Sequence, residues 1–270
     1  MNERVSGFAG QANGDTVELH DVHLSFGEHK VLRGVSLKVD RGETLCIVGG
    51  SGVGKSTILR LILRLILPDS GRVLVMGRDI CRAPLTEVFE LRQQIGMVFQ
   101  GGALFDSMSV HDNVAFPLYE HTAMGEEAIG TRVDEVLRFV NLDPQRVREL
   151  LPAELSGGMR KRVGIARAIV HEPPILLFDE PTSGLDPATT KTIDYLILKL
   201  SAELGVCAVI VTHDIGSARR VADRVALVRD GLIAAEDEPE KLFRSDDPYV
   251  RAFTGEARES STSVPREELS

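Results

Sequence analysis

Residues 49–57, with the sequence GGSGVGKST, place glycines, a lysine and a hydroxyl at the spacing GxxxxGK[ST]. An apolar run precedes the motif and a helical pattern follows it. Glycines let the backbone curl so that its N–H groups surround a phosphate at the positive end of the next helix. The alternative is a glycine-rich turn before an ordinary core helix, and it is disfavoured by the strand and helix in register on either side of the motif. The pattern predicts a nucleotide site that uses Mg²⁺, lined by Gly49, Gly50, Ser51, Gly52, Val53, Gly54, Lys55, Ser56 and Thr57.

Each polar side chain of this motif has a specific expected task. Lys55 would place its ammonium on the β- and γ-phosphates, and the Ser56 hydroxyl would bind Mg²⁺. Two carboxylates, Asp179 and Glu180, end the apolar run 175–178. A strand of a parallel sheet delivers its last residues to the ligand crevice, so Asp179 is expected to hold Mg²⁺ and Glu180 to act as general base on water. Alone, such a pair could also cap the next turn.

A third motif, Leu155 to Met159 (LSGGM), precedes a helix rich in Arg and Ala. Ser156 is a good N-cap, and Gly157 and Gly158 expose backbone N–H groups at a helix N-terminus. Two interpretations stay open on these residues alone. One is a capped helix, and the other is an anion-binding surface completed by another molecule's phosphate.

Composition limits the partners. The 270 residues carry a formal net charge of −9, which argues against a broad nucleic-acid-binding face or adhesion to anionic lipid head groups. Three separated cysteines indicate no disulfide framework or metal cluster, which favours a reducing compartment. The N-terminus lacks a signal-peptide core, and arginines interrupt the apolar run 58–67. We expect a cytosolic protein that meets a membrane through a partner.

Strand and helix patterns alternate along the chain and predict an α/β fold with a parallel sheet. Antiparallel strands are expected at 17–20 and 35–39, and a helix from 55 to about 67. Further strands are expected at 44–48, 73–76, 95–99, 175–178, 208–211, 225–228 and 232–235, with mostly helical structure over 109–171 and a helix at 187–204. Residues 1–15 and 246–270 are expected to be tails, with Tyr249 and Phe253 docking on the rest of the chain or on a dimer mate.

The order and spacing of these motifs resemble those of ABC transporter ATPase subunits over residues 16–245. Ser183-Gly184-Leu185-Asp186 and His213 match further motifs of that family, Gln100 resembles its Q-loop glutamine, and Phe26 its adenine-stacking aromatic residue. The resemblance implies a P-loop NTPase fold, with a RecA-like parallel core, an antiparallel β subdomain and a helical subdomain at about 101–171.

The resemblance also implies a head-to-tail homodimer. Ser156, Gly157 and Gly158 would contact the γ-phosphate held by the partner, and Asp186 would link the two sites. His213 would hold the γ-phosphate and water beside Glu180, and Gln100 would sense Mg²⁺. Two residues depart from the family pattern: Met159 stands where Gln is usual, and Phe26 where Tyr is usual.

The segment 101–108, GGALFDSM, is similar to a segment of the MlaF-type ATPases that drive phospholipid or other lipid transport with Mce-domain systems. This resemblance implies a lipid-transport ATPase on the cytoplasmic side of the inner membrane. Its partners would be an MlaE-like permease and an Mce-domain protein, with Leu104 and Phe105 meeting the permease. The alternatives are that both residues merely pack the helical subdomain, that the cargo is a polar amino acid or another small solute, and that the chain is a non-transport ABC ATPase.

Overall fold

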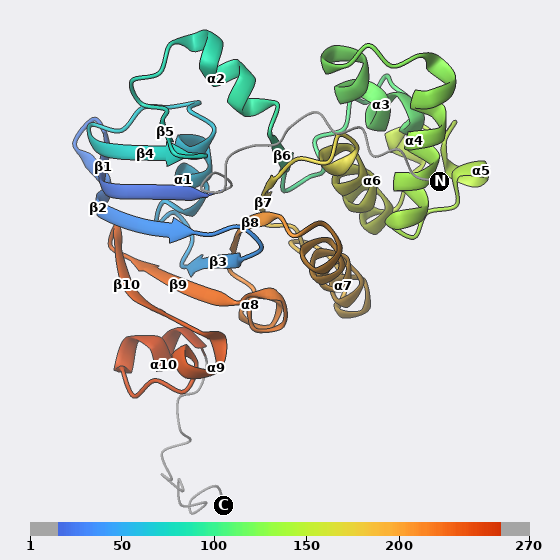
Figure 1. Ribbon diagram of the computed structural model, residues 1–270. Helices are drawn as coiled ribbons and strands as arrows, with labels where there is room; N and C mark the ends of the chain where they lie inside the picture. Colours follow the sequence, from blue (N-terminus) through green and yellow to red (C-terminus); the bar gives the residue numbers. More distant parts are fainter. Residues whose placement is uncertain (1–15, 255–270) are drawn as a thin grey trace, which may run out of the picture.

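The computed structural model describes residues 16–254 (Figure 1). The tail predicted for residues 1–15, and residues 255–270 of the predicted C-terminal tail, lie outside this range.

A six-stranded sheet forms the centre of the fold, in the order β10-β9-β3-β8-β7-β6. Its neighbours pair in parallel, apart from β9 and β10, which pair antiparallel. The strands are β3 (Thr44–Gly49), β6 (Ile95–Val98), β7 (Ile175–Asp179), β8 (Cys207–Thr212), β9 (Arg224–Arg229) and β10 (Leu232–Asp237). Because β3, β7 and β8 run parallel, the residues that follow them meet at one edge of the sheet. The predicted α/β fold with a parallel core is confirmed.

A second sheet is antiparallel, in the order β2-β1-β4-β5. It comprises β1 (Val17–Phe26), β2 (His29–Val39), β4 (Ser70–Val75) and β5 (Arg78–Asp79), and so confirms the predicted antiparallel unit. Helix α1 (Lys55–Ile62) packs between the two sheets, and its buried Ile58 and Leu59 share one core with Leu45 and Ile47 of β3. The alternate residues of β3, Cys46 and Val48, face the opposite core.

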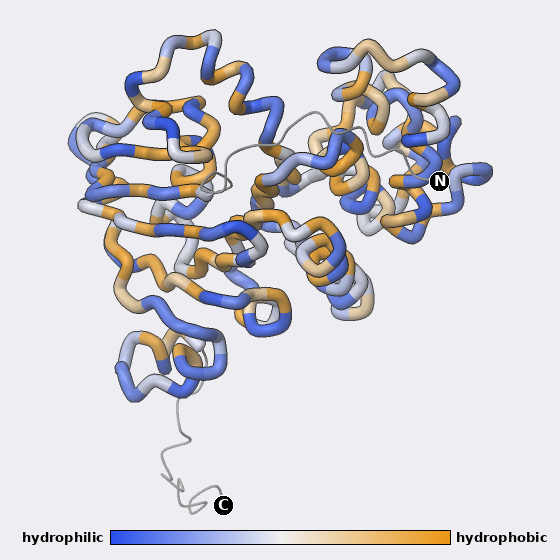
Figure 2. The backbone as a smooth tube through the Cα atoms, in the orientation of Figure 1, coloured by the Kyte–Doolittle hydropathy of each residue, from blue (hydrophilic) through white to orange (hydrophobic). Residues whose placement is uncertain are grey.

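The other face of the central sheet is covered by helices (Figure 1). Helix α7 (Pro187–Leu204) occupies the predicted range, and α8 (Ile215–Val221) lies beside it. The predicted helical region holds α3 (Val110–His121), α4 (Glu126–Phe139), α5 (Pro144–Val147), a 3₁₀ turn (Pro152–Glu154) and α6 (Gly157–Ile169). In Figure 2 the hydrophobic residues concentrate along the sheet strands and recur at intervals along the helices, as burial of one helix face requires.

The predicted helix over residues 55–67 is wrong at its C-terminal end, because α1 ends at Ile62. Arg64 adopts a left-handed φ of 48°, and the Leu65 N–H donates to the Arg60 carbonyl at 2.8 Å. The main-chain carbonyls just after the helix are hydrogen-bonded by the Arg92 guanidinium, which donates to Leu63 O at 2.8 Å and to Arg64 O at 3.0 Å. A side chain 28 residues away in the sequence therefore helps to end this helix.

Helix α2 (Leu85–Arg92) was not predicted. It buries Val88 and Leu91 but leaves Leu85 and Phe89 exposed, so its sequence lacks a clear apolar stripe. The short helices α8 and α9 (Pro239–Leu242) were also missed.

The chain's described C-terminal end is helical, as α10 (Pro248–Thr254). Val250 is buried, and Tyr249 and Phe253 pack half-buried against the main core, as expected for residues that dock on the rest of the chain. The Arg229 guanidinium lies 4.3 Å from the Tyr249 ring centroid. Among the described helices none is long and apolar enough to cross a membrane.

Two glycines inside helices differ in the space left around them, so we expect a larger residue to destabilise the protein at one and an alanine to stabilise it at the other. A Cβ at Gly164 of α6 would lie 3.1 Å from Gly102 Cα, whereas a Cβ at Gly130 of α4 would meet nothing closer than 4.0 Å. Gly164→Val should lower the free energy of unfolding by about 1–3 kcal/mol through overpacking. Gly130→Ala should raise it by about 0.5–1 kcal/mol, because alanine is the better helix former. Urea unfolding of the full chain measures both, and equal stabilities of the two variants would contradict the packing argument.

Candidate nucleotide site

The phosphate-binding loop needs its glycines for steric reasons. Gly49, Gly52 and Gly54 have φ values of 156°, 77° and 103°. A Cβ at Gly49 would lie 2.6 Å from the Val228 carbonyl oxygen, and one at Gly54 would lie 2.9 Å from Leu32 Cδ2. The loop joins β3 to α1, whose N-cap has no side-chain hydrogen bond and whose first turn has no acidic residue. This N-terminus therefore keeps backbone N–H donors for an anion.

Lys55 lies buried inside this loop. Its Nζ donates to the carbonyl oxygens of Gly49 at 2.9 Å and Gly50 at 2.8 Å. Burial lowers the pKa of Lys55, and the charges of Glu180 and Asp179 oppose that shift. The ammonium is thus held at the loop, close to two carboxylates.

Ser56 and Asp179 come together although 123 residues separate them. The Ser56 hydroxyl donates to Asp179 Oδ1 at 2.8 Å, because α1 starts and β7 ends at the same edge of the sheet. A hydroxyl and one carboxylate fit Mg²⁺, which takes few protein ligands and fills its octahedron with water and phosphate oxygens. Within residues 16–254 no group of three or more His, Cys, Asp or Glu side chains could hold a metal ion.

Glu180 and His213 form the second pair at this edge. His213 Nδ1 lies 2.8 Å from Glu180 Oε2, and the Glu180 side chain is 13% exposed. Glu180 has a left-handed φ of 49°, and its N–H is held by the Val211 carbonyl of β8 at 2.9 Å. This conformation is sparsely populated for residues other than glycine, so the surrounding structure must hold Glu180 in it. The pair can accept a proton from a water molecule positioned beside it.

Gln100 follows β6 and is exposed. Its Nε2 donates to Ser183 Oγ at 3.4 Å, so in the structure its side chain lies against the loop after Glu180 rather than against Ser56 and Asp179. The main-chain carbonyl oxygen of Gln100 accepts a hydrogen bond from the Lys161 ammonium of α6.

Lys161 is the residue that the sequence analysis missed. It is 5% exposed, and its Nζ also donates to the Glu180 carbonyl oxygen at 3.1 Å. Burial lowers the pKa of Lys161, against the charges of Glu180 and Asp179. Its spacing from the buried Ile165 and Ala168, at i+4 and i+7, places it on the apolar face of α6 and could have revealed it.

Ser156, Gly157 and Gly158 begin α6 on the surface. The Ser156 hydroxyl accepts from the Met159 N–H at 3.3 Å, so Ser156 is the N-cap that was predicted, which is compatible with either interpretation of this motif. Asp186 likewise caps α7, since its Oδ1 accepts from the N–H groups of Ala188 and Thr189 at 3.0 Å. Hydrogen bonds from Thr189 lower the pKa of the Asp186 carboxyl. Across the described residues, no hydrogen bond joins Ser156–Gly158 to the phosphate loop of the same chain.

The remaining predicted residues lie on two loops. Phe26 is 52% exposed at the end of the β1–β2 hairpin, whose Val31 and Leu32 pack against Gly54. Phe105 is 42% exposed and its ring lies 5.0 Å from that of Phe116. Leu104, in contrast, packs half-buried against the main core.

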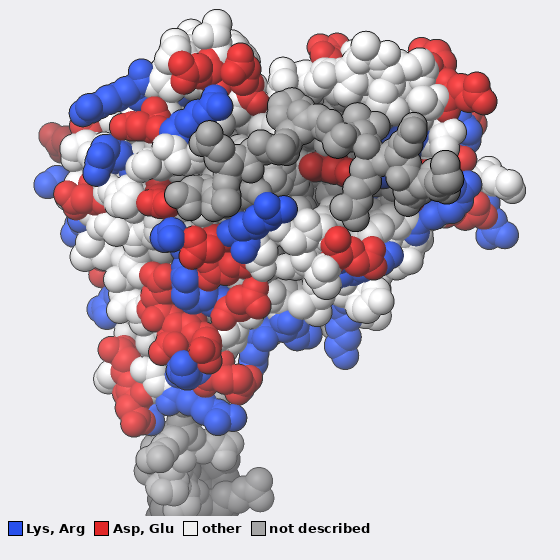
Figure 3. Space-filling model, viewed as in Figure 1, with Lys and Arg blue, Asp and Glu red and all other residues white. Residues whose placement is uncertain are grey.

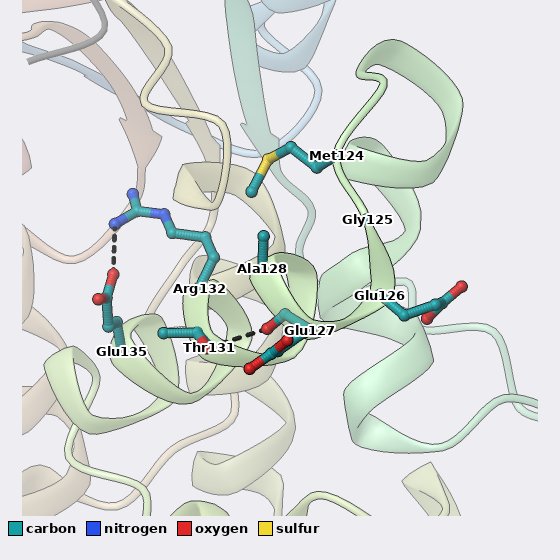
Figure 4. Close-up of a pocket in the computed structure, with 8 residues that line it drawn as sticks. All are labelled: Met124, Gly125, Glu126, Glu127, Ala128, Thr131, Arg132 and Glu135. Atoms are coloured by element: carbon teal, nitrogen blue, oxygen red, sulfur yellow. Dashed lines mark hydrogen bonds and ion pairs between the residues drawn. The ribbon is translucent and has the colours of Figure 1, made fainter.

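Other surface features lie apart from these residues. A hollow at the start of α4 is lined by Met124 through Ala128, Thr131, Arg132 and Glu135, and Figure 4 shows Arg132 turned toward Glu135. No residue predicted for the nucleotide site contributes to it. On the face seen in Figure 3, acidic side chains gather below the centre of the molecule, with basic side chains among them.

Comparison with known proteins supports a nucleotide site at this edge of the sheet. The family model described as ABC transporter matches residues 32–183. The "Probable ribonucleotide transport ATP-binding protein mkl" of Mycobacterium leprae is 40% identical over 89% of this chain and 69% of its own length. For the Mycobacterium tuberculosis protein of that name the chain covers 66% of the relative's length. The "Intermembrane phospholipid transport system ATP-binding protein MlaF" of Escherichia coli K12 is 39% identical over 90% of both chains.

Solved structures of ATP-binding cassettes are also similar to this chain in fold and sequence. The dimeric ATP-binding cassette MJ0796, bound to ADP and Pi, superposes with a TM-score of 0.76 at 36% identity, covering 83% of this chain and 98% of that one. CbiO1 of Clostridium perfringens gives a TM-score of 0.77 at 32% identity, covering 86% of this chain and 91% of that one. This chain belongs to the ATP-hydrolysing, ATP-binding subunits of ABC transporters.

Proposed function

We propose that this chain energises lipid transport between membranes, as one of two identical ATPase subunits bound to an integral-membrane permease. The observation that carries the ATPase mechanism is the pair of short contacts at one sheet edge, Ser56 to Asp179 and Glu180 to His213, both 2.8 Å. They bring together a Mg²⁺-binding pair and a general base beside Lys55.

Each residue then has a chemical role. Lys55 and the N–H groups of residues 49–57 bind the β- and γ-phosphates, and Phe26 stacks on adenine. Ser56 and Asp179 would hold Mg²⁺, and Gln100 would join them once its side chain turns away from Ser183. When bound, Mg²⁺ neutralises charge on the phosphate oxygens. Glu180 accepts a proton from water as the water oxygen attacks the γ-phosphorus, and His213 keeps that water in place. The bond to the bridging oxygen breaks, and ADP and phosphate leave.

The exposed start of α6 supports a composite site. Ser156, Gly157 and Gly158 present a helix N-terminus to the outside, where a second copy of the chain can bring its γ-phosphate. Asp186 starts α7 close by, since a Cβ at Gly158 would touch Thr189. A head-to-tail homodimer therefore completes both ATP sites, and the dimeric cassette MJ0796 is a related precedent.

The segment after Gln100 is held firmly enough to transmit movement. The buried Asn113 side chain accepts from Phe105 N–H at 2.8 Å and donates to the carbonyls of Phe105, Met108 and Ser109. This support leaves the Phe105 ring exposed as a permease contact. Leu104, the other predicted permease contact, is half-buried against the main core and so offers less surface than Phe105.

The cargo assignment draws on two relatives with different names. The MlaF protein matches over 90% of its length and is named for phospholipid transport, whereas the mkl proteins match over 66–69% and are named for ribonucleotide transport. Together with the segment 101–108, the fuller match favours lipid. The partners are then an MlaE-like permease and an Mce-domain protein, and the subunit lies on the cytoplasmic side of the inner membrane.

A transport assay tests the cargo directly. The chain is reconstituted into liposomes with the permease that co-purifies with it, and the movement of radiolabelled phospholipid and of a labelled ribonucleotide is measured with and without ATP. We expect ATP-dependent phospholipid movement. ATP-dependent uptake of the ribonucleotide, with phospholipid unmoved, would contradict the lipid assignment and favour the mkl-type cargo.

Glu180→Gln should bind ATP with near-normal affinity but hydrolyse it about 10²–10⁴-fold more slowly, because it removes the base. The variant should also accumulate as an ATP-dependent dimer, measured by light scattering with and without Mg-ATP. Lys55→Ala is the comparison variant and should show no such dimer. Normal turnover by Glu180→Gln would exclude Glu180 as the base.

Phe105→Ala should weaken permease association by about 2 kcal/mol if Phe105 is an interface anchor. Nucleotide binding by the isolated subunit should stay unchanged, because Phe105 lies outside the phosphate loop. Tyr195→Ala is a matched control, since Tyr195 is an aromatic residue 61% exposed on α7. Co-purification with the permease at graded concentrations measures both, and equal retention of the two variants would assign Phe105 to packing alone.

A further inference from the structure

Helix α6 touches both ATP sites of the proposed dimer. Its first residues, Ser156 to Gly158, lie on the surface that faces a partner's ATP. Lys161 follows within about one helical turn, but it points into its own subunit and is 5% exposed. One short length of helix therefore separates a surface contact from the interior of the catalytic site.

The Lys161 ammonium joins two separate segments. It donates to the main-chain carbonyl of Gln100, which follows β6, and to that of Glu180 at 3.1 Å, which follows β7. Burying an ammonium is costly unless hydrogen bonds and opposite charges offset the lost hydration. Here both carbonyls and the nearby Asp179 and Glu180 carboxylates provide that offset.

The segment after Gln100 is fixed to the same helix further along. Arg167 donates to the carbonyls of Gly102 and Ala103, each at 2.9 Å, and Gly164 packs closely against Gly102. Lys161, Gly164 and Arg167 are spaced three residues apart, so they lie along one side of α6. A shift of α6 therefore carries residues 100–103 with it and pulls on the Glu180 peptide through Lys161.

We propose that Lys161 is a positioning residue that sets Glu180 and Gln100 for hydrolysis when the start of α6 docks on a partner's ATP. The inference rests on the proposed homodimer. Glu180 is a suitable target because its φ of 49° is a sparsely populated conformation that depends on its surroundings. Lys161 acts through Glu180 and does not itself touch the reacting atoms.

Steady-state kinetics of the full chain with Mg-ATP test this role. Lys161→Met should lower kcat by about 100-fold, the effect of a misplacement near 1 Å, with ATP affinity and melting temperature unchanged. Lys161→Arg keeps a charged donor and should restore most of the lost rate. Lys199→Met is the matched control, because Lys199 is a half-buried lysine on α7 that contacts the Phe139 ring, and it should turn over normally.

A double variant separates positioning from mere stability. If Lys161 acts through Glu180, adding Lys161→Met to Glu180→Gln should change the residual rate by no more than about threefold. The double variant should still form the ATP-dependent dimer. The same 100-fold loss in both backgrounds, or a kcat of Lys161→Met equal to the unaltered chain, would overturn the inference. If Lys161→Met melts lower, the rates of all four chains are measured well below its melting temperature, under the same criteria.

The experiment also distinguishes the two proposals. If Glu180→Gln itself forms no ATP-dependent dimer, the result counts against the proposed function and also against the role of Lys161, which depends on the dimer. Dimer formation by Glu180→Gln combined with normal turnover by Lys161→Met would leave the function intact and remove only the role of Lys161.

Discussion

The hydrogen bond from Ser56 to Asp179 depends on a parallel sheet whose strands end at one edge. Strands β3, β7 and β8 are adjacent, in the order β3-β8-β7, and all their residues apart from Asp179 are buried. Burial on both faces fixes their register, so the residues after them are placed by the rigid core and not by flexible loops. That alignment places the phosphate-binding loop, the Ser56–Asp179 pair and the Glu180–His213 pair at the same edge of the sheet.

Helix α6 has the second organising role. It contributes the exposed turn at Ser156, the buried Lys161 and the Arg167 that holds the segment after Gln100. A helix is stiff over this length, so contacts at its two ends cannot change independently. The proposed partner surface and the proposed permease contact are thus joined by secondary structure as well as by chain connectivity.

The residues of the ATP site and the proposed permease contact lie in different parts of the molecule. The nucleotide-binding residues lie at the sheet edge, whereas Phe105 lies on a surface loop supported by Asn113 and Arg167. Fold and site therefore establish an ATPase, but they do not name the transported molecule. The different names carried by relatives of similar identity, phospholipid and ribonucleotide transport, are consistent with that division.

Much of this protein was determined by local sequence. The phosphate loop, the strand ending in Asp179 and Glu180, the cap at Ser156 and helix α7 are encoded by short patterns of glycine, apolar and capping residues, and each lies where the pattern predicts. Local patterns suffice here because backbone sterics, capping and burial act within a few residues.

Other features were decided by the tertiary structure, because they depend on groups distant in the sequence. The end of α1 is set partly by Arg92, and α2 forms although its apolar residues are split between core and surface. Leu104 packs half-buried against the core while the next residue, Phe105, stays exposed. Lys161 is the clearest case. Its sequence shows one lysine in a basic helix, and only the folded chain brings the carbonyls of Gln100 and Glu180, 61 and 19 residues away, to its ammonium.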